Sequence, residues 1–346
     1  MNSSIKTEIC DLLGIKYPII QAGMGPHNTV NLAIAVSNSG AMGTVSIPGM
    51  SLGPEKATEK FREYLHTVKA HTKNNFAVNT PVGENVPKNV FKTSEAYVNT
   101  VFEEKEKDPE LKKRLNLYIT SAGNPARYVQ KIKEAGMLHF HVVASAYHAQ
   151  KVEKLGLDGV IASGYEAGGH THLPERTIHT FILIPQVVEA VKIPVIAAGG
   201  VCDAKTFVAA LALGAKGIQM GTRFIATKES DLHNNYKEFI DKAGEWSDIV
   251  VPGVYGPLRC LKNRGTEGVI KVVESRSLSE EDLAMYKDKQ LLLSQKDGDM
   301  ELGLVASGQV ASRINDIPSV SELIESIMRE STVLVQKMQK RMVNHE

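Results

Sequence analysis

The sequence has few cysteines and no long apolar segment, and each absence excludes a class of protein. Among its 346 residues are three cysteines, Cys10, Cys202 and Cys260, which stand far apart with no CxxC pair. This spacing argues against a disulfide framework or a structural zinc site and suits a reducing compartment. The chain has no run of about 18 apolar residues, so the sequence predicts no membrane span. The first ten residues lack the apolar segment of a secretory signal, so we expect a cytoplasmic protein.

An excess of charge of one sign is also missing. The chain has 40 Lys and Arg against 39 Asp and Glu, a formal net charge of +1 at pH 7. We therefore expect neither nucleic acid nor an anionic membrane as a partner. With 42% hydrophobic and 23% charged residues, the composition is that of a globular protein that can bury a large core.

Eight short apolar runs are present, and each is followed by a stretch with helical character. Several runs are apolar at every position, which is typical of parallel strands covered by helices on both faces. Strand and helix alternate at roughly 20–35 residues per unit, the period of a βα repeat. The runs are residues 18–24, 41–47, 76–82, 115–123, 138–145, 159–165, 194–200 and 217–223.

Eight such units predict an α/β fold of the (β/α)8 TIM-barrel type over residues 1–243. An open doubly wound sheet remains the alternative, because periodicity alone does not show closure. Residues 83–114 are long and charge-rich for one connection, and we expect an exposed helical excursion there. Residues 244–310 lose the βα rhythm and predict an appended lid. In residues 311–346, an amphipathic helix from about 319 to 342 is expected to pack on the barrel or on a partner subunit, which leaves a homodimer possible.

The carboxyl ends of barrel strands are where a TIM barrel places its active site. Gly199 and Gly200 end the seventh run, and Gly221 and Thr222 end the eighth. Free main-chain N–H groups and a hydroxyl at these two neighbouring turns predict a phosphate site. The alternative is that the glycines merely permit turns between strand and helix.

The loop GYEAGGH follows the sixth run. Gly168 and Gly169 let the main chain approach a flat or charged ligand closely, and His170 comes next. A tight turn with an exposed histidine is the alternative. Glu166, His170 and His172 stand close enough for a metal site, but the other strand ends offer no further Asp, Glu or Cys, so no metal is expected. A phosphate site, amides at strand ends and one histidine indicate a cofactor that carries the chemistry of a small-molecule substrate.

With these motifs, the chain resembles the nitronate monooxygenase family, a sister of the flavin-dependent enoyl-acyl-carrier-protein reductases. The shared segments are YPIIQAGM, FAVN, SAGNP, GYEAGGH, PVIAAGGVCDAKTFVAALALGAKGIQMGTRF and GDMELGLVASGQV. The resemblance implies a TIM barrel with a small second domain and one non-covalent FMN. The cofactor-binding residues expected are Ala22, Gly23, Met24, Asn79, Ala122, Gly123, Gly168, Gly169, Gly199, Gly200, Gln219, Gly221 and Thr222.

The resemblance also implies that His170 is the catalytic residue. An imidazole with a pKa near 7 suits proton removal from a nitroalkane, whose nitronate then reduces the flavin. Oxygen takes the electrons onward, giving a carbonyl compound and nitrite. NADH-dependent reduction of an enoyl thioester is the alternative activity, and a flavin protein without turnover is a third. QAGMGPHN departs from the GGM-W turn of many relatives, and His172 stands where a small residue is common, so its role is left open.

Overall fold

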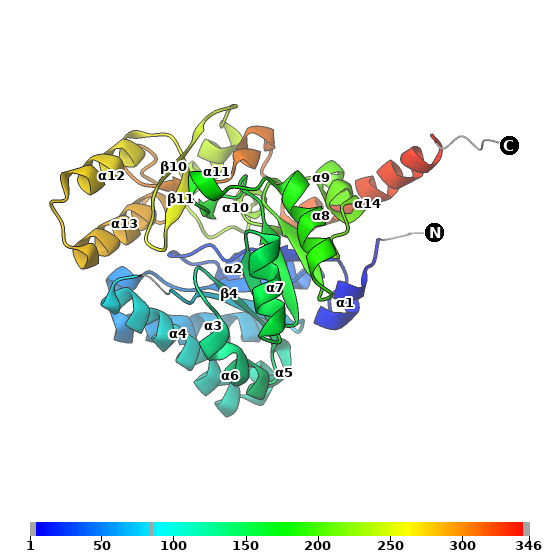
Figure 1. Cartoon of the computed structure of the whole chain (residues 1–346), viewed down its shortest axis with the longest axis horizontal. Helices are drawn as coiled ribbons and strands as arrows, with labels where there is room; N and C mark the ends of the chain where they lie inside the picture. Colours follow the sequence, from blue (N-terminus) through cyan, green and yellow to red (C-terminus); the bar gives the residue numbers. More distant parts are fainter. Residues whose placement is uncertain (1–4, 84–85, 342–346) are drawn as a thin grey trace.

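A sheet of eight parallel strands forms the centre of the protein. The computed structural model describes residues 5–83 and 86–341 (Figure 1). The strand order is β1-β9-β8-β6-β5-β4-β3-β2, and each predicted run contains one of these strands. They are β1 (Ile19–Gln21), β2 (Gly43–Ser46), β3 (Phe76–Pro81), β4 (Leu115–Ser121), β5 (Leu138–Val143), β6 (Gly159–Ser163), β8 (Val195–Ala198) and β9 (Gly217–Met220).

The sheet closes on itself between its first and last strands. A parallel bridge joins Ile20 of β1 to Met42, next to β2. The Gln21 N–H donates to the Met42 carbonyl, and the Met42 N–H donates to the Ile19 carbonyl, both at 2.9 Å. The predicted (β/α)8 barrel is therefore confirmed over the open sheet. Its interior is filled by Ile20, Met42, Ala77, Leu117, Ile119, Phe140, Ile161, Ile196 and Ala198.

Helices surround the barrel, and one more closes its base. The short helix α1 (Glu8–Leu13) buries Ile9, Cys10 and Leu13 against the barrel interior. The other helices up to residue 241 are α2 (Val30–Asn38), η1 (Met50–Leu52), α3 (Pro54–His71), α4 (Lys88–Lys107), α5 (Pro109–Arg114), η2 (Ala126–Tyr128), α6 (Val129–Glu134), α7 (Ala146–Lys154), η3 (Pro174–Arg176), α8 (Thr180–Ala190), α9 (Ala204–Ala212), α10 (Thr222–Ile225) and α11 (Asn234–Asp241). In the described residues, no helix is both long and apolar enough to cross a membrane.

Residues 83–114 contain helices, as the sequence predicts, but they are not the exposed excursion that it predicts. Helix α4 is the outer helix of the third βα unit, and it packs against α3. The Tyr97 side chain is fully buried and meets Phe61 edge to face, with ring centroids 5.4 Å apart. Even Lys105 is buried, and its ammonium donates to the Lys112 carbonyl at 2.9 Å. The many charges concealed an apolar stripe at helical spacing, which faces the barrel. Glu84 and Asn85, in the same predicted segment, lie outside the described residues.

Residues 244–310, here called the lid, contain a second, antiparallel sheet. Its strands are β10 (Asp248–Pro252), β11 (Pro257–Leu261) and β12 (Val305–Ala306), with α12 (Arg264–Ser275) and α13 (Glu280–Gln295) beside them (Figure 1, yellow to orange). Strand β11 also pairs with β7 (Gly169–His170), which comes from the loop after β6. Two residues of the predicted site loop, Gly169 and His170, thus form a strand of the lid sheet.

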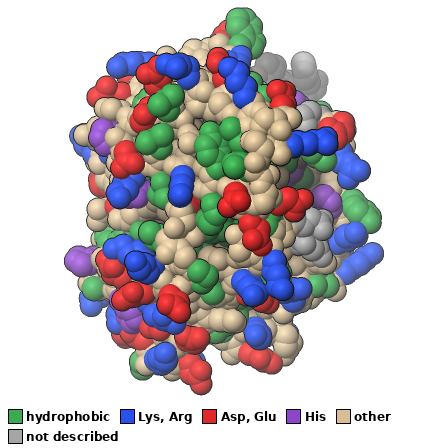
Figure 2. Space-filling view, turned by 90° about the vertical axis from the view of Figure 1, so that its left-hand side faces the viewer, with side chains coloured by type: hydrophobic (Ala, Val, Ile, Leu, Met, Phe, Trp, Pro, Cys, Tyr) green, Lys and Arg blue, Asp and Glu red, His purple; other side chains and the backbone are tan. Residues whose placement is uncertain are grey.

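The last helix, α14 (Val320–Gln339), follows η4 (Gln309–Arg313). Its apolar side, Leu323, Ile324, Ile327 and Met328, is buried in the core that the barrel helices share. It packs against α9 and α2, so the predicted contact with the barrel is present. Residues 342–346 lie outside the described residues, and a homodimer stays a prediction. Figure 2 shows acidic and basic side chains intermixed over one face, in keeping with the balanced net charge.

Candidate functional site

The turn after β1 meets residues from two other strand ends at the carboxyl rim of the barrel. Gly23 lies so close to Asn79 of β3 that a Cβ there would overlap the Asn79 amide oxygen. A Cβ at Gly221, after β9, would lie 3.5 Å from the Ala22 side chain and 3.6 Å from Met24 Sδ. Gln219 sits between Ile20 and Ala198 in the strand register. The structure therefore brings the first, third and eighth strand ends together, as the sequence predicts.

The glycine pair after β8 and the turn after β9 offer main-chain donors at the same rim. Gly199 and Gly200 have φ of 87° and 75°, a backbone region that favours glycine. In the described part of the chain, the N–H groups of Gly200, Gly221 and Thr222 have no hydrogen-bond acceptor. Such groups attract an anion.

A residue that the sequence analysis did not select joins this turn to the GYEAGGH loop. The Gly308 N–H donates to Thr222 Oγ1 at 2.9 Å. Gly168 packs directly on Ser307 and Gly308, with no room for a Cβ. Gly308 lies in the segment ASGQV, which the sequence comparison with the family includes. The sequence does not show that Gly308 contacts Thr222 and Gly168, because both are far away in the chain.

The Ala122–Gly123 turn after β4 is fixed by its carbonyl groups. Ala122 adopts φ of 52° and Gly123 φ of 146°. The carbonyls of Ser121 and Ala122 accept from the N–H groups of Val82 and Gly83 at 2.8 and 2.9 Å. With the carbonyls held on that side, the N–H groups of Ala122 and Gly123 have no acceptor among the described residues. This turn therefore provides a second set of available main-chain N–H donors.

His170 lies in β7, opposite Leu258 of β11. Its Nε2 accepts a hydrogen bond from the Tyr255 main-chain N–H at 3.1 Å, and the two rings meet edge to face at 5.4 Å. A neutral imidazole whose Nε2 accepts must carry its proton on Nδ1. Among the described residues Nδ1 has no hydrogen-bond partner, so it is an available donor. Tyr255 lies in the turn of the hairpin that β10 and β11 form. His170 therefore contacts this hairpin rather than the glycine turns.

The charge state of His170 differs from the sequence expectation of a pKa near 7. The surrounding protein atoms and then the positive charge of Lys287 lower the pKa of His170 to about 4. Part of the ring surface stays open to water, which moderates the effect of burial without reversing it. The imidazole is therefore neutral at pH 7.

His172 and Glu166, the other candidates in this loop, are engaged elsewhere. His172 Nε2 lies 3.3 Å from the Ser163 carbonyl, which requires a proton on that nitrogen. The Glu166 carboxylate accepts from the Thr180 N–H and hydroxyl at 3.0 and 2.9 Å. Both side chains hold the loop in place. No group of three potential ligands for a metal ion occurs among the described residues.

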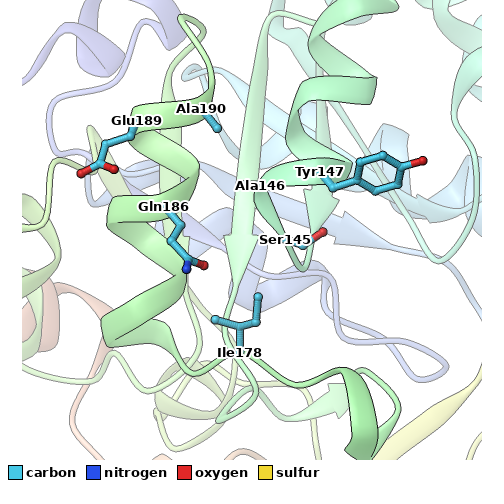
Figure 3. Close-up of a pocket in the computed structure, with 7 residues that line it drawn as sticks. All are labelled: Ser145, Ala146, Tyr147, Ile178, Gln186, Glu189 and Ala190. Carbon is cyan, nitrogen blue, oxygen red and sulfur yellow. The ribbon is translucent and has the colours of Figure 1, made fainter.

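An open hollow of about 500 Å³ lies between α7 and α8, away from these residues (Figure 3). Ser145, Tyr147, Ile178 and Gln186 line it, and the Tyr147 ring is largely exposed. None of the predicted site residues contributes to it, so we assign the hollow no part in the site.

The family model described as nitronate monooxygenase matches residues 6–330. The chain belongs to the nitronate monooxygenase family. It is thus an oxidoreductase of a flavin-dependent family.

Proteins with different names are similar to the chain over nearly its whole length. It is 30% identical to a "(3aS,4S,5R,7aS)-5-hydroxy-7a-methyl-1-oxo-octahydro-1H-indene-4-carboxyl-CoA dehydrogenase" of Mycobacterium tuberculosis, over 96% of this chain and 98% of that protein. It is also 30% identical to a probable nitronate monooxygenase of Staphylococcus aureus, over 96% and 99% of the two chains. FabK from Thermotoga maritima is 33% identical, with a TM-score of 0.82 and 98% and 100% coverage. Nitroalkane oxidase from Streptomyces ansochromogenes, at 22% identity and a TM-score of 0.78, shares the fold over 95% and 99% of the chains.

Proposed function

We propose that this protein is an FMN-dependent nitronate monooxygenase, which oxidises nitronates with O₂ to a carbonyl compound and nitrite. The observation that carries the proposal is the tautomer of His170. Its Nε2 is engaged by Tyr255, and its Nδ1–H is available as a donor. A neutral donor beside the barrel rim suits a nitronate oxygen, which is an anionic acceptor.

The residues at the rim fit FMN. The available N–H groups of Gly200, Gly221 and Thr222 would hold the phosphate, and the tight Gly23 turn beside Asn79 would let a flat ring approach the main chain. The N–H groups of Ala122 and Gly123 would donate to polar atoms of the ring. Bound FMN would supply the redox chemistry, accepting electrons from the nitronate and passing them to oxygen.

The chain's own groups favour a preformed nitronate over a neutral nitroalkane. Removing the α-proton of a nitroalkane requires a free lone pair on an imidazole nitrogen. In His170 that lone pair is on Nε2 and already accepts from the Tyr255 N–H. A nitronate needs no proton removal, and His170 Nδ1–H orients its oxygen by donating to it. His170 is therefore assigned as a hydrogen-bond donor rather than as a base.

Anaerobic mixing of FMN-loaded protein with propionate 3-nitronate and, separately, with neutral 2-nitropropane tests this function. The flavin absorbance should bleach rapidly with the nitronate and much more slowly with the neutral compound. The His170→Ala variant should bind FMN normally and react slowly, whereas an unchanged rate would show that His170 takes no part in the reaction. Absence of bleaching by any nitronate in the wild type overturns the proposal.

A second candidate is NADH-dependent reduction of an enoyl thioester, which the 33% identity to FabK favours. The same Nδ1–H donor would polarise a thioester carbonyl. Rapid flavin reduction by NADH, with consumption of crotonyl thioester, would select this activity over the first. Measuring NADH and nitronate side by side on one preparation therefore distinguishes the two.

A further inference from the structure

A buried ammonium group stands beside the β10–β11 hairpin that contacts His170, and it has no carboxylate partner among the described residues. Lys287, on α13, has 7% of its surface exposed, and its Nζ donates to the Gly253 carbonyl at 3.0 Å. Within the described residues, no carboxylate oxygen forms an ion pair with it. Its neighbour Asp288 is engaged elsewhere, because Asp288 Oδ2 accepts from the Ser51 N–H at 2.9 Å.

Such a group is unfavourable in isolation. Lysines are almost never buried unless they are paired, because removing an ammonium from water is strongly unfavourable. Burial accordingly lowers the pKa of Lys287. One carbonyl satisfies one of the three ammonium donors. The remaining donors and the positive charge are available to an anion.

The position of Lys287 links this charge to the candidate catalytic residue. Gly253 belongs to the hairpin that presents the Tyr255 N–H, and a Cβ at Gly253 would lie 3.1 Å from His170 Nε2. The charge of Lys287 is also near enough to lower the pKa of His170. The ammonium, the hairpin and the imidazole therefore form one cluster at the junction of lid and barrel.

We propose that Lys287 is a specificity-determining residue that compensates the negative charge of the substrate at His170. The inference rests on the proposed function and deepens it. His170 supplies a neutral donor, and Lys287 supplies the charge that makes an anion more favourable there than a neutral molecule of the same shape. A nitronate can accept the hydrogen bond of His170 and is attracted by the charge of Lys287. A neutral nitroalkane is a weaker acceptor and has no net charge to be compensated.

A purely structural role for Lys287 is the competing explanation, since its ammonium also holds the Gly253 carbonyl. Three variants separate the two roles. Lys287→Gln keeps an N–H donor for the carbonyl and removes the charge, Lys287→Arg keeps the charge, and Lys289→Gln removes an exposed charge from the same helix as a matched control.

The experiment titrates FMN-loaded protein with nitrate, an unreactive planar anion, and follows the flavin absorbance spectrum. It also measures KM and kcat for an alkyl nitronate. Lys287→Gln should weaken nitrate binding and raise KM by about 10- to 100-fold, the size expected for one charge-assisted hydrogen bond, with a smaller change in kcat. Lys287→Arg should retain most of the affinity, and Lys289→Gln should match the wild type. FMN affinity should be unchanged in all three.

Two outcomes overturn the inference. One is a Lys287→Gln variant that binds nitrate and nitronate as the wild type does. The other is a Lys287→Arg variant as impaired as Lys287→Gln, since the positive charge would then not be what matters. Failure of the proposed function is distinguishable, because it would appear as a wild type that oxidises no nitronate. Nitrate binding that depends on Lys287 would support the inference even then.

Discussion

The main-chain N–H of Tyr255 donates to Nε2 of His170 across 3.1 Å, although the two residues are 85 positions apart in the chain. This contact determines which nitrogen of the imidazole carries the proton. The donor is a main-chain group, so the hydrogen bond depends on the position of the hairpin and not on the side chain of residue 255. The tautomer of His170 is thus set by the lid backbone.

Gly253→Ala should disturb this contact without unfolding the protein. The added Cβ would lie 2.7 Å from the Gly256 carbonyl oxygen and 2.8 Å from the Leu258 Cβ, so the hairpin must shift. Because misplacement by about 1 Å can cost up to about 100-fold in rate, we expect kcat/KM for a nitronate to fall at least tenfold. The matched control is Gly244→Ala, whose Cβ would meet nothing closer than Ser247 Oγ at 3.8 Å. Equal kinetics for the two variants would contradict the role of the hairpin.

Gly23→Ala should abolish or severely weaken FMN binding. Its Cβ would overlap the amide of Asn79, which itself donates to the Ile119 carbonyl at 3.2 Å and cannot move freely. The turn after β1 must then move away from the rim. Fluorescence titration of apoprotein with FMN measures the affinity, and circular dichroism checks the fold. Full FMN affinity in a folded variant would exclude this turn from the flavin site.

Acid should destabilise the protein through two histidines in the barrel wall. His139 Nε2 and His141 Nδ1 both lie 2.8 Å from Thr120 Oγ1. Burial lowers the pKa of His139 to about 3 and that of His141 to about 4, below the unfolded value of about 6.5. Between pH 6.5 and 4 the unfolded chain therefore binds more protons, and stability falls as pH drops, by up to about 1.4 kcal/mol per pH unit for each histidine.

Urea unfolding at a series of pH values from 7 to 5 measures this slope. His139→Phe should make it shallower, while replacing the exposed His71 by Gln should leave it unchanged. Other histidines with lowered pKa values stay in both variants, so the slope should not vanish. A slope that is the same in His139→Phe and the wild type would show that His139 is not neutral in the fold.

Arg259→Met should cost about 3–5 kcal/mol of folding free energy, the usual effect of removing one partner from a buried ion pair. Arg259 pairs with Asp248 in the lid, and it also donates to the Tyr165 carbonyl at 2.9 Å in the barrel loop. The variant would leave the Asp248 carboxylate, which is mostly buried, without its cation. Urea unfolding should show the loss, whereas Lys60→Ala, which breaks an exposed pair with Glu63, should cost less than about 1 kcal/mol.

The sequence was informative where structure is local and periodic. Short apolar runs at the period of a βα repeat predicted all eight barrel strands, and glycine pairs indicated which turns lie at the rim. The burial of α4 was missed because Lys and Glu residues outnumber its apolar stripe, which Tyr97 and Val101 exemplify. Tyr255 and Lys287 were missed because their roles depend on contacts with residues far away in the chain, and neither residue type signals a partner by itself. The lowered pKa of His170 was missed because it depends on the surrounding protein atoms and on Lys287, which a motif does not give.

Pairing between β7 and β11 makes His170 part of the sheet that covers the barrel. A lid displacement wide enough to admit a small molecule must therefore carry the imidazole with it, away from the rim. The position of the imidazole relative to the glycine turns is thus coupled to the position of the lid sheet.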